Sequence, residues 1–192
     1  ERKQHITKEF DNKEEFELNW VEASAHPIGA VGLWNSMIKI IKMAKEKGDD
    51  IIVICEDDHY FTENYSPKLL FKEVTEAYIQ GAEVLSGGIG GFGQAIPAGY
   101  HRYKVDWFWC TQFIVIYNRF FDKMLDYSFQ NTDTADGVIS KLATNIMVIY
   151  PFISEQKDFG YSDVTQSNME QQGKIREHFA RANKHMKSIS LK

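Results

Sequence analysis

Residues 51–60 read IIVICEDDHY, and the interpretation of the whole chain starts from this stretch. Five apolar residues, four of them β-branched, run directly into Glu56, Asp57 and Asp58. A short apolar run of this kind predicts a strand that is covered on both faces. Adjacent carboxylates at the end of a strand repel one another, and a bound cation relieves that repulsion most directly. The stretch therefore predicts a buried strand that carries acidic side chains to a ligand site.

Strand-like and helix-like patterns alternate along the rest of the chain. Helices are expected at about 1–17, within 26–50, at 66–80, from 119 onward and at 134–144, with strands at 17–23, 51–55, 82–88, 111–118 and 146–153. Gly48 is the expected end of the second helix, and Ser66 is the expected cap of the third. This alternation predicts a single-domain α/β fold with a largely parallel central sheet flanked by helices. We expect the domain to occupy 1–165, with 166–192 as a polar peripheral helix or tail. Ligands of such sheets bind beyond the carboxyl ends of the strands, where Glu56, Asp57 and Asp58 stand.

Composition narrows the classes of function and the cellular setting. The 192 residues carry a formal net charge of −5 and an isoelectric point near 5.7, which argues against a nucleic-acid-binding protein. No apolar run approaches the roughly 18 residues of a membrane span, and no signal peptide precedes the fold, so we expect a cytoplasmic protein. Peripheral attachment to a membrane stays open. Cys55 and Cys110 have no metal-like spacing and are interpreted as buried thiols of a reducing compartment.

The acidic triplet suits a hard divalent cation. Mg²⁺ and Mn²⁺ prefer oxygen ligands, and they commonly bind one or two carboxylates together with phosphate oxygens. One interpretation is therefore a cation that joins Asp58 to a diphosphate. The other interpretation is an ordinary solvated turn. The chemistry of the residues alone does not favour the metal site over the turn.

Several stretches together resemble a known enzyme family. VICEDD (53–58), GAVGLWNSMIKII (29–41), TQFIVIYNRFFDKML (111–125) and FGYSDVT (159–165) occur in the order found in nucleotide-sugar glycosyltransferases with the A-type fold. The chain is most similar to the family 25 glycosyltransferases of lipopolysaccharide and related glycan synthesis. The resemblance covers about residues 1–165, although only the acidic motif is chemically specific. In two respects the chain departs from the family: Met37 follows Ser36 where the family usually has histidine, and the family's first strand would lie before Glu1.

The resemblance implies a metal-dependent transfer of a sugar from a nucleotide-sugar donor to a hydroxyl group of a glycan or other acceptor. It makes Asp58 the direct ligand of Mn²⁺ or Mg²⁺, with Asp57 beside it, and it turns Glu56 and Asp57 toward the ribose or metal-bound water. Asp163 is the expected third metal ligand, with a turn cap as its alternative. His178 and His185 are weaker candidates, and a structural role is the favoured interpretation of His59.

Residues of the acceptor side are expected later in the chain. Trp107 and Trp109 are candidates for stacking on a sugar, with an aromatic corner of the core as the alternative. Asp106 and Gln112 could bind sugar hydroxyls. An inverting transfer also needs a carboxylate base, whereas a retaining transfer does not. The candidates for a catalytic carboxylate are Asp136 and Asp133. The resemblance favours Asp136 as the base or as an anchor of the acceptor, and Asp133 is then the expected cap of the following helix.

Two other classes of function remain open at this stage. A metal-dependent phosphoryl-transfer or hydrolase domain would also place carboxylates at strand ends. A non-catalytic carbohydrate-binding relative of the transferases would keep the aromatic residues without the donor site. The glycine-rich loop GGIGGFGQAIPAG (87–99) lacks a phosphate-loop pattern and is interpreted as a mobile loop over the cleft.

Overall fold

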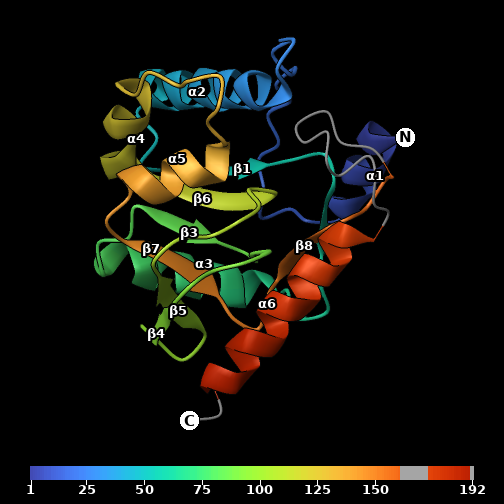
Figure 1. Cartoon of the computed structure of the whole chain (residues 1–192), viewed down its shortest axis with the longest axis vertical. Helices are drawn as coiled ribbons and strands as arrows, with labels where there is room; N and C mark the ends of the chain where they lie inside the picture. The colour runs from blue at the N-terminus through green and yellow to red at the C-terminus, as the bar shows by residue number, and fades with distance from the viewer. Residues whose placement is uncertain (161–172, 191–192) are drawn as a thin grey trace.

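The structure, a computed structural model, describes residues 1–160 and 173–190 and consists of a central sheet between layers of helices (Figure 1). The helices are α1 (Arg2–Glu9), α2 (Gly29–Lys47), α3 (Pro67–Ile79), α4 (Asn118–Leu125), α5 (Ala135–Leu142) and α6 (Lys174–Ser190). The strands are β1 (Ile51–Cys55), β2 (His59–Phe61), β3 (Val84–Ser86), β4 (Ala95–Pro97), β5 (Arg102–Val105), β6 (Phe113–Tyr117), β7 (Ile146–Ile149) and β8 (Ser154–Gln156).

The central sheet is mixed, and the expectation of a largely parallel sheet was wrong. Its strand order is β1-β6-β3-β7-β5-β4, and β3 with β7 is its parallel pair. β6 lies between β1 and β3 and runs antiparallel to both. The three strands β1, β3 and β7 therefore point the same way, as the alternating pattern predicted, but β6 separates β1 from the other two. The amino end of β6 lies beside the carboxyl ends of β1 and β3, at the same end of these three strands.

The alternation of side chains along β6 divides the core into two halves. Ile114 and Ile116 face the half that is covered by α2, α4 and α5. Phe113, Val115 and Tyr117 face the half that is covered by α3. All five side chains are buried, so β6 is covered on both faces of the sheet. A continuous apolar run in a central strand is typical of this environment.

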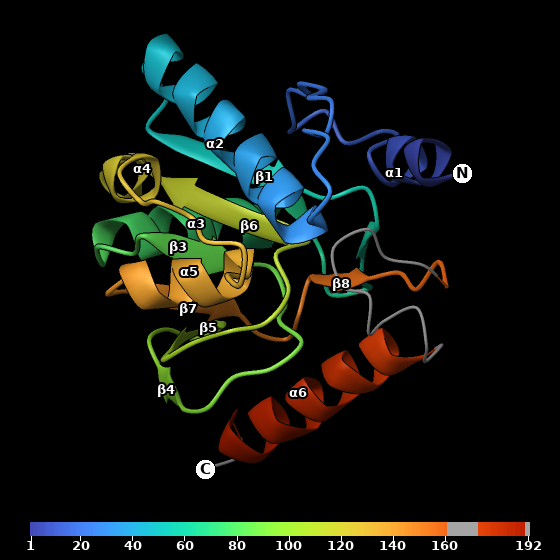
Figure 2. The ribbon, with the colours of Figure 1, turned by 45° about the horizontal axis from the view of Figure 1, so that its top comes forward.

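The last helix completes the first of these two halves. α6 buries Phe179, Ala182 and Met186 among the residues of that core and leaves its charged face outside. It contacts β4 and β8 and runs along the side of the molecule away from α2 (Figure 2). The polar segment at the end of the chain thus contains an amphipathic helix that packs through one apolar stripe.

A second, small sheet holds the first helix. β2 pairs antiparallel with β8, and α1 packs against β2. The Phe10 and Phe61 rings meet edge to face with centroids 5.4 Å apart, and the imidazole Nε2 of His5 lies 2.8 Å from the carbonyl oxygen of His59. This contact places α1 beside the turn that follows β1.

Several elements differ from those that the sequence predicted. No strand forms at 17–23, and α1 ends at Glu9 rather than near residue 17. Four short strands, β2, β4, β5 and β8, were not expected. β1 lies at an edge of the six-stranded sheet. Ile52 and Ile54 pack with one half of the core and Val53 and Cys55 with the other, so both faces are covered as expected, but only Ile54 is buried and the other residues are partly exposed. An apolar run shows that a strand is favoured, but its lateral position depends on which distant strand pairs with it.

Helix ends agree with the sequence signals. The Ser66 hydroxyl accepts a hydrogen bond from the Leu69 amide at the start of α3, and Gly48 ends α2 in the left-handed conformation. Among the residues that the structure describes, no helix is both long enough and apolar enough to cross a membrane.

Candidate functional site

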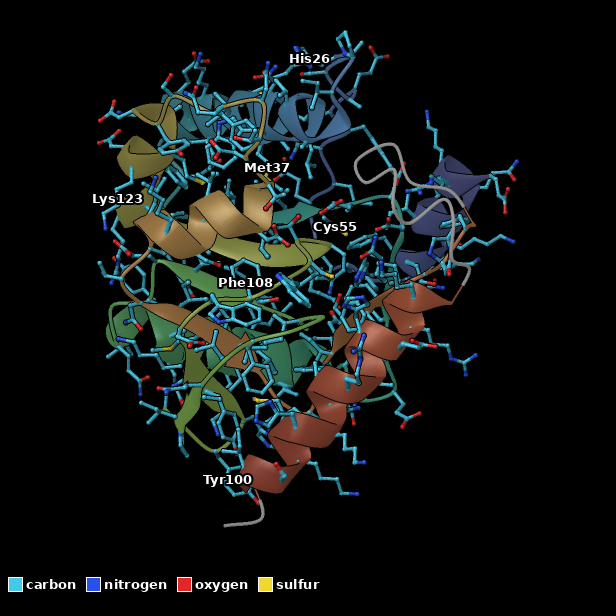
Figure 3. All side chains as sticks on the ribbon, viewed as in Figure 1. His26, Met37, Cys55, Tyr100, Phe108 and Lys123 are labelled. Carbon is cyan, nitrogen blue, oxygen red and sulfur yellow. The ribbon has the colours of Figure 1, made fainter. Side chains whose placement is uncertain are left out.

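The acidic triplet forms the turn that joins the central sheet to the small sheet. The Glu56 amide donates to the Gln112 carbonyl at 3.0 Å, which extends the β1–β6 ladder by one bond. The His59 amide then donates to the Glu56 carbonyl, and the chain continues into β2. Cys55, which precedes this turn, is labelled in Figure 3 on the side of the sheet toward α1. The turn therefore lies between two sheets, with Asp58 buried, Glu56 half-buried and Asp57 exposed.

Burial in this fold favours the neutral form of Glu56. Burial, together with the negative charge of Asp58, raises its pKa to about 8. Its Oε1 accepts a hydrogen bond from the Thr111 hydroxyl at 2.5 Å, which opposes the shift. A carboxyl group that is protonated near neutrality can donate a hydrogen bond to a ligand, unlike an ionised one.

Asp57 and Asp58 occupy different environments although they are adjacent. The Asp57 side chain is 54% exposed, whereas that of Asp58 is 6% exposed. Burial raises the pKa of Asp58, and hydrogen bonding from Gln156 and the charge of Arg2 act in the opposite direction. Its Oδ2 accepts from Gln156 Nε2 at 2.8 Å, while its buried Oδ1 has no hydrogen-bond partner among the described residues.

Arg2 of α1 joins the two aspartates. Its Nη1 lies 2.7 Å from Asp57 Oδ1 and 3.2 Å from Asp58 Oδ2. The guanidinium thus stands where the sequence predicted a divalent cation. Arg2 lies far from the acidic turn in sequence, and no local motif indicated this contact.

The described residues do not fit the metal site that was expected. Within 1–160 and 173–190 no three histidine, cysteine, aspartate or glutamate side chains are grouped as metal ligands. The carboxylates that would bind Mg²⁺ or Mn²⁺ are already ion-paired to Arg2. Asp163 lies outside the described residues. The two weaker candidates contact aromatic rings instead: His178 lies beside Trp109 and His185 stacks on Phe92.

Asp136 approaches the same region from the start of α5. Its Oδ2 accepts from the Cys110 amide at 3.2 Å, and Cys110 is followed by Thr111, the partner of Glu56. Cys110 has a φ of 77°, a left-handed conformation that costs energy for a residue other than glycine and is common at functional sites. Burial, together with the charges of Asp136, Glu56 and Asp58, raises the pKa of the Cys110 thiol. Asp136 and Glu56 therefore flank one strained peptide segment.

The sequence suggested Asp133 as the cap of α5, but Asp133 does not cap this helix. Thr134 is the cap, and its hydroxyl accepts from the Gly137 amide at 3.3 Å. Asp133 Oδ2 instead accepts from the Gln130 amide and the Tyr127 hydroxyl. Its contacts stabilise the loop between α4 and α5, and they do not support a catalytic role.

The aromatic residues divide between core and surface. Trp109 is 47% exposed, and its ring centroid lies 5.2 Å from that of Trp107 and 5.4 Å from the His178 ring of α6. Phe108 between them is buried, as Figure 3 shows near the centre of the molecule. Alternation therefore leaves an open aromatic surface next to the Cys110–Asp136 contact.

Two candidates for binding sugar hydroxyls have structural partners. Asp106 Oδ1 accepts hydrogen bonds from the amides of Gly93, Gln94 and Trp107. Gln112 is 1% exposed, and its Nε2 donates to the Gly88 carbonyl and to Ser154 Oγ. Because Gln112 is buried and its amide nitrogen is engaged, it supports the loop from beneath and does not reach an acceptor.

The glycine-rich loop is packed in its first part and exposed in its second. Residues 87–90 are buried, and a Cβ atom at Gly88 would lie 1.9 Å from the Ser154 carbonyl oxygen. A Cβ atom at Gly90 would lie 2.7 Å from Cys110 Sγ, so these glycines permit a close approach of backbones. The second part contains the exposed edge strand β4, and the mobility of the loop stays a prediction.

His59 is a core residue, as the sequence favoured. It is fully buried, and its Nδ1 lies 2.8 Å from Ser154 Oγ. Burial lowers its pKa to about 3, so the ring is neutral. Sequence reasoning missed Thr111, Arg2 and Gln156 as partners of the acidic turn, because each of them reaches it through tertiary pairing.

Comparison with known proteins shows the fold. No family model and no curated protein matches the chain. Among solved structures it is similar to the A197 protein from STIV, with a TM-score of 0.56 and 15% identity over 81% of this chain and 78% of that one. Two crystal structures of UDP-glucose pyrophosphorylase, apo and complexed with UDP-glucose, score 0.45 and 0.48 at 10% identity; the chain covers 61% and 72% of them. The similarity to the two pyrophosphorylase structures is too weak to support any conclusion about this chain. The similarity to the A197 protein shows a shared mixed α/β fold and nothing about function.

Proposed function

We propose that this protein is a glycosyltransferase that moves a sugar from a nucleotide-sugar donor to a hydroxyl group of a carbohydrate or other acceptor. One observation carries the proposal: the acidic turn and Asp136, which are distant in sequence, meet on either side of Cys110 and Thr111. Trp109, which is 47% exposed, directly precedes Cys110 in the chain. Carboxyl groups beside an aromatic surface are parts that a sugar transfer can use.

The donor side of the proposed site is the acidic turn. Asp57 is exposed enough to accept hydrogen bonds from ribose hydroxyls. Burial favours the neutral form of Glu56, and in that form its carboxyl group can donate a hydrogen bond to an oxygen of the donor. These two roles retain the sequence prediction that Glu56 and Asp57 face the nucleotide.

The acceptor side is formed by Trp109, Trp107 and Asp136. A sugar ring stacks its apolar face on the exposed indole of Trp109, beside the half-buried indole of Trp107. The acceptor hydroxyl oxygen attacks the anomeric carbon, the bond from that carbon to the diphosphate oxygen breaks, and its electron pair leaves with the nucleoside diphosphate. The hydroxyl proton passes to the Asp136 carboxylate, which the Cys110 and Gly137 amides hold in place. This assignment describes an inverting transfer.

Binding of the donor is the first test. The melting temperature of the protein is measured with a panel of nucleoside diphosphates and nucleotide sugars, each in excess EDTA and again with Mn²⁺. A ligand at about 100 times its dissociation constant stabilises the fold by roughly 2.7 kcal/mol, which is readily detected. Stabilisation by one nucleotide class supports the proposal, and no stabilisation by any of them under either condition contradicts it.

Asp136→Asn tests the chemical step. The amide keeps the size and the acceptor oxygen of the carboxylate but cannot take a proton, so turnover is expected to fall by about 10²–10⁴-fold. Donor affinity should be unchanged. Asp122→Asn, which makes the same charge change on the exposed surface of α4, should transfer sugar at the wild-type rate.

Other outcomes of these experiments favour other functions. Release of free phosphate from simple esters, without preference for nucleotide sugars, would indicate a phosphoryl-transfer or hydrolase domain. Binding of oligosaccharides that quenches tryptophan fluorescence, without any nucleotide affinity, would indicate a non-catalytic carbohydrate-binding protein.

A further inference from the structure

Arg2 occupies the position that a divalent cation was expected to fill. Its Nη1 contacts a carboxylate oxygen of Asp57 and one of Asp58, at 2.7 Å and 3.2 Å. The Arg2 side chain is 17% exposed, so solvent screens these contacts only in part. A guanidinium stays charged at every pH of interest, and at such distances it relieves the repulsion that the sequence assigned to a metal ion.

The second aspartate is tied down from another direction as well. Asp58 Oδ2 accepts from Arg2 and from Gln156 Nε2, so this oxygen already has two donors. A dication that used both aspartates would have to displace Arg2 and place two positive charges beside it. Mg²⁺ gives up its own water ligands reluctantly and demands near-ideal octahedral geometry, which makes that exchange unfavourable.

A second cation, Lys157, contacts the same aromatic ring as Arg2. Phe159 follows β8, and its ring centroid lies 5.0 Å from the Arg2 guanidinium carbon and 4.8 Å from Lys157 Nζ. The Lys157 amide donates to the Asp58 carbonyl at 2.7 Å, which fixes this lysine to the acidic turn. The two cations carry a charge of +2, which matches the charge of −2 on Asp57 and Asp58 when both are ionised.

We propose that Arg2, with Lys157, neutralises the acidic turn and supplies the positive charge for the diphosphate of the donor, so that nucleotide-sugar binding here does not depend on a metal. The inference rests on the proposed function. It replaces a divalent cation by two side chains of the protein. As the donor bond breaks, the charge that develops on the diphosphate oxygen is stabilised by these fixed cations.

The experiment is a titration of the stabilising nucleotide into the wild-type protein, in EDTA and in Mn²⁺, by calorimetry. The dissociation constant is expected to agree within about twofold between the two conditions, a difference of under 1 kcal/mol. Arg2→Gln should weaken binding in EDTA by about tenfold or more. Mn²⁺ should restore part of that loss, because both aspartates are then open to a metal.

Two further variants separate the charge of Arg2 from its place in α1. Lys3→Gln makes the same charge change at the next, exposed position of that helix and should bind like the wild type. Lys157→Gln lies outside α1 and should weaken binding even if Arg2→Gln loosens the helix. Melting temperatures without ligand show whether each variant is folded.

Three results would overturn the inference. Loss of wild-type nucleotide binding in EDTA, with recovery in Mn²⁺, would make the metal essential; the proposed transfer function would survive that result. Unchanged affinity in both Arg2→Gln and Lys157→Gln would make the two cations purely structural. Absence of nucleotide binding under every condition would remove the proposed function and this inference together.

Discussion

Single residues in the site owe their properties to neighbours that are distant in sequence. Glu56 and Asp58 look equivalent in the string EDD, yet one pairs with the Thr111 hydroxyl and the other with Gln156 and Arg2. The position of carboxylates after a strand was readable from the sequence. The protonation of Glu56 and Asp58 could not be predicted from the sequence, because desolvation and the charges of other segments set the pKa of each carboxyl group.

The raised pKa of Glu56 predicts a dependence of stability on pH. Its ordinary value is 4.5 and its value in the fold is about 8, so between these limits the folded state binds more protons than the unfolded state. This contribution is fully present below pH 4.5 and is lost as pH rises toward about 8. Glu56→Gln stays neutral and should lack this loss, so its stability relative to the wild type should increase with pH in urea unfolding.

Glu46→Gln serves as the control for that series. It removes a carboxylate from the exposed face of α2, and its unfolding free energy should follow the wild-type pH profile. Parallel profiles for Glu56→Gln and the wild type would show that Glu56 ionises normally in the folded protein.

At the scale of elements, α3 and β5 are joined by an ion pair that no local pattern indicated. Arg102 and Glu73 are both 0% exposed and form a hydrogen-bonded pair, and Glu76 Oε2 adds a second contact to Arg102 at 3.3 Å. Breaking such a pair leaves a buried charge without its partner, which costs far more than the pair itself contributes.

Glu73→Gln should therefore destabilise the protein by about 3–5 kcal/mol. Asp122→Asn breaks the exposed pair with Lys45, which solvent screens, and should cost at most about 1 kcal/mol. Both losses would be measured as changes in the free energy of unfolding by urea at neutral pH. Equal and small losses in the two variants would mean that Arg102 finds another partner or water.

Helix signals in the sequence were reliable where they combined a cap with an apolar stripe. Ser66 before α3 and Gly48 after α2 lie where the sequence indicated. The short strands β2 and β8 were not predictable in this way, because three residues carry no period of their own and pair only across the chain. The acidic turn is held in place by these two strands.

At the scale of the whole molecule, stability should be greatest in the middle of the sheet. β6 pairs with strands on both sides and is fully buried, whereas β4 is an exposed edge strand. In native-state hydrogen exchange, the amides of β6 should open only with global unfolding, while those of β4 exchange through local fluctuations. Equal protection of β4 and β6 would contradict this ranking of the strands.

The site, too, belongs to the whole molecule. Its parts come from α1, the turn after β1, the segment before β6, the start of α5 and one face of α6. The sequence placed the carboxylates and tryptophans as candidates, but it assigned their counter-charge to a metal ion. The sequence did not indicate Arg2 as that counter-charge, because its contact with the aspartates forms only once α1 packs on β2.

The sequence by itself determined that this chain is an α/β protein, where its main helices and strands lie, and that acidic groups follow β1. These features depend on the period of apolar residues and on local caps, which act over a few residues. Only the tertiary structure decided that β6 separates β1 from β3, that residues 87–90 of the glycine-rich loop are packed and that Arg2 pairs with the acidic turn. Strand order, close backbone approach and ion pairing are set by segments that meet only after the chain has folded.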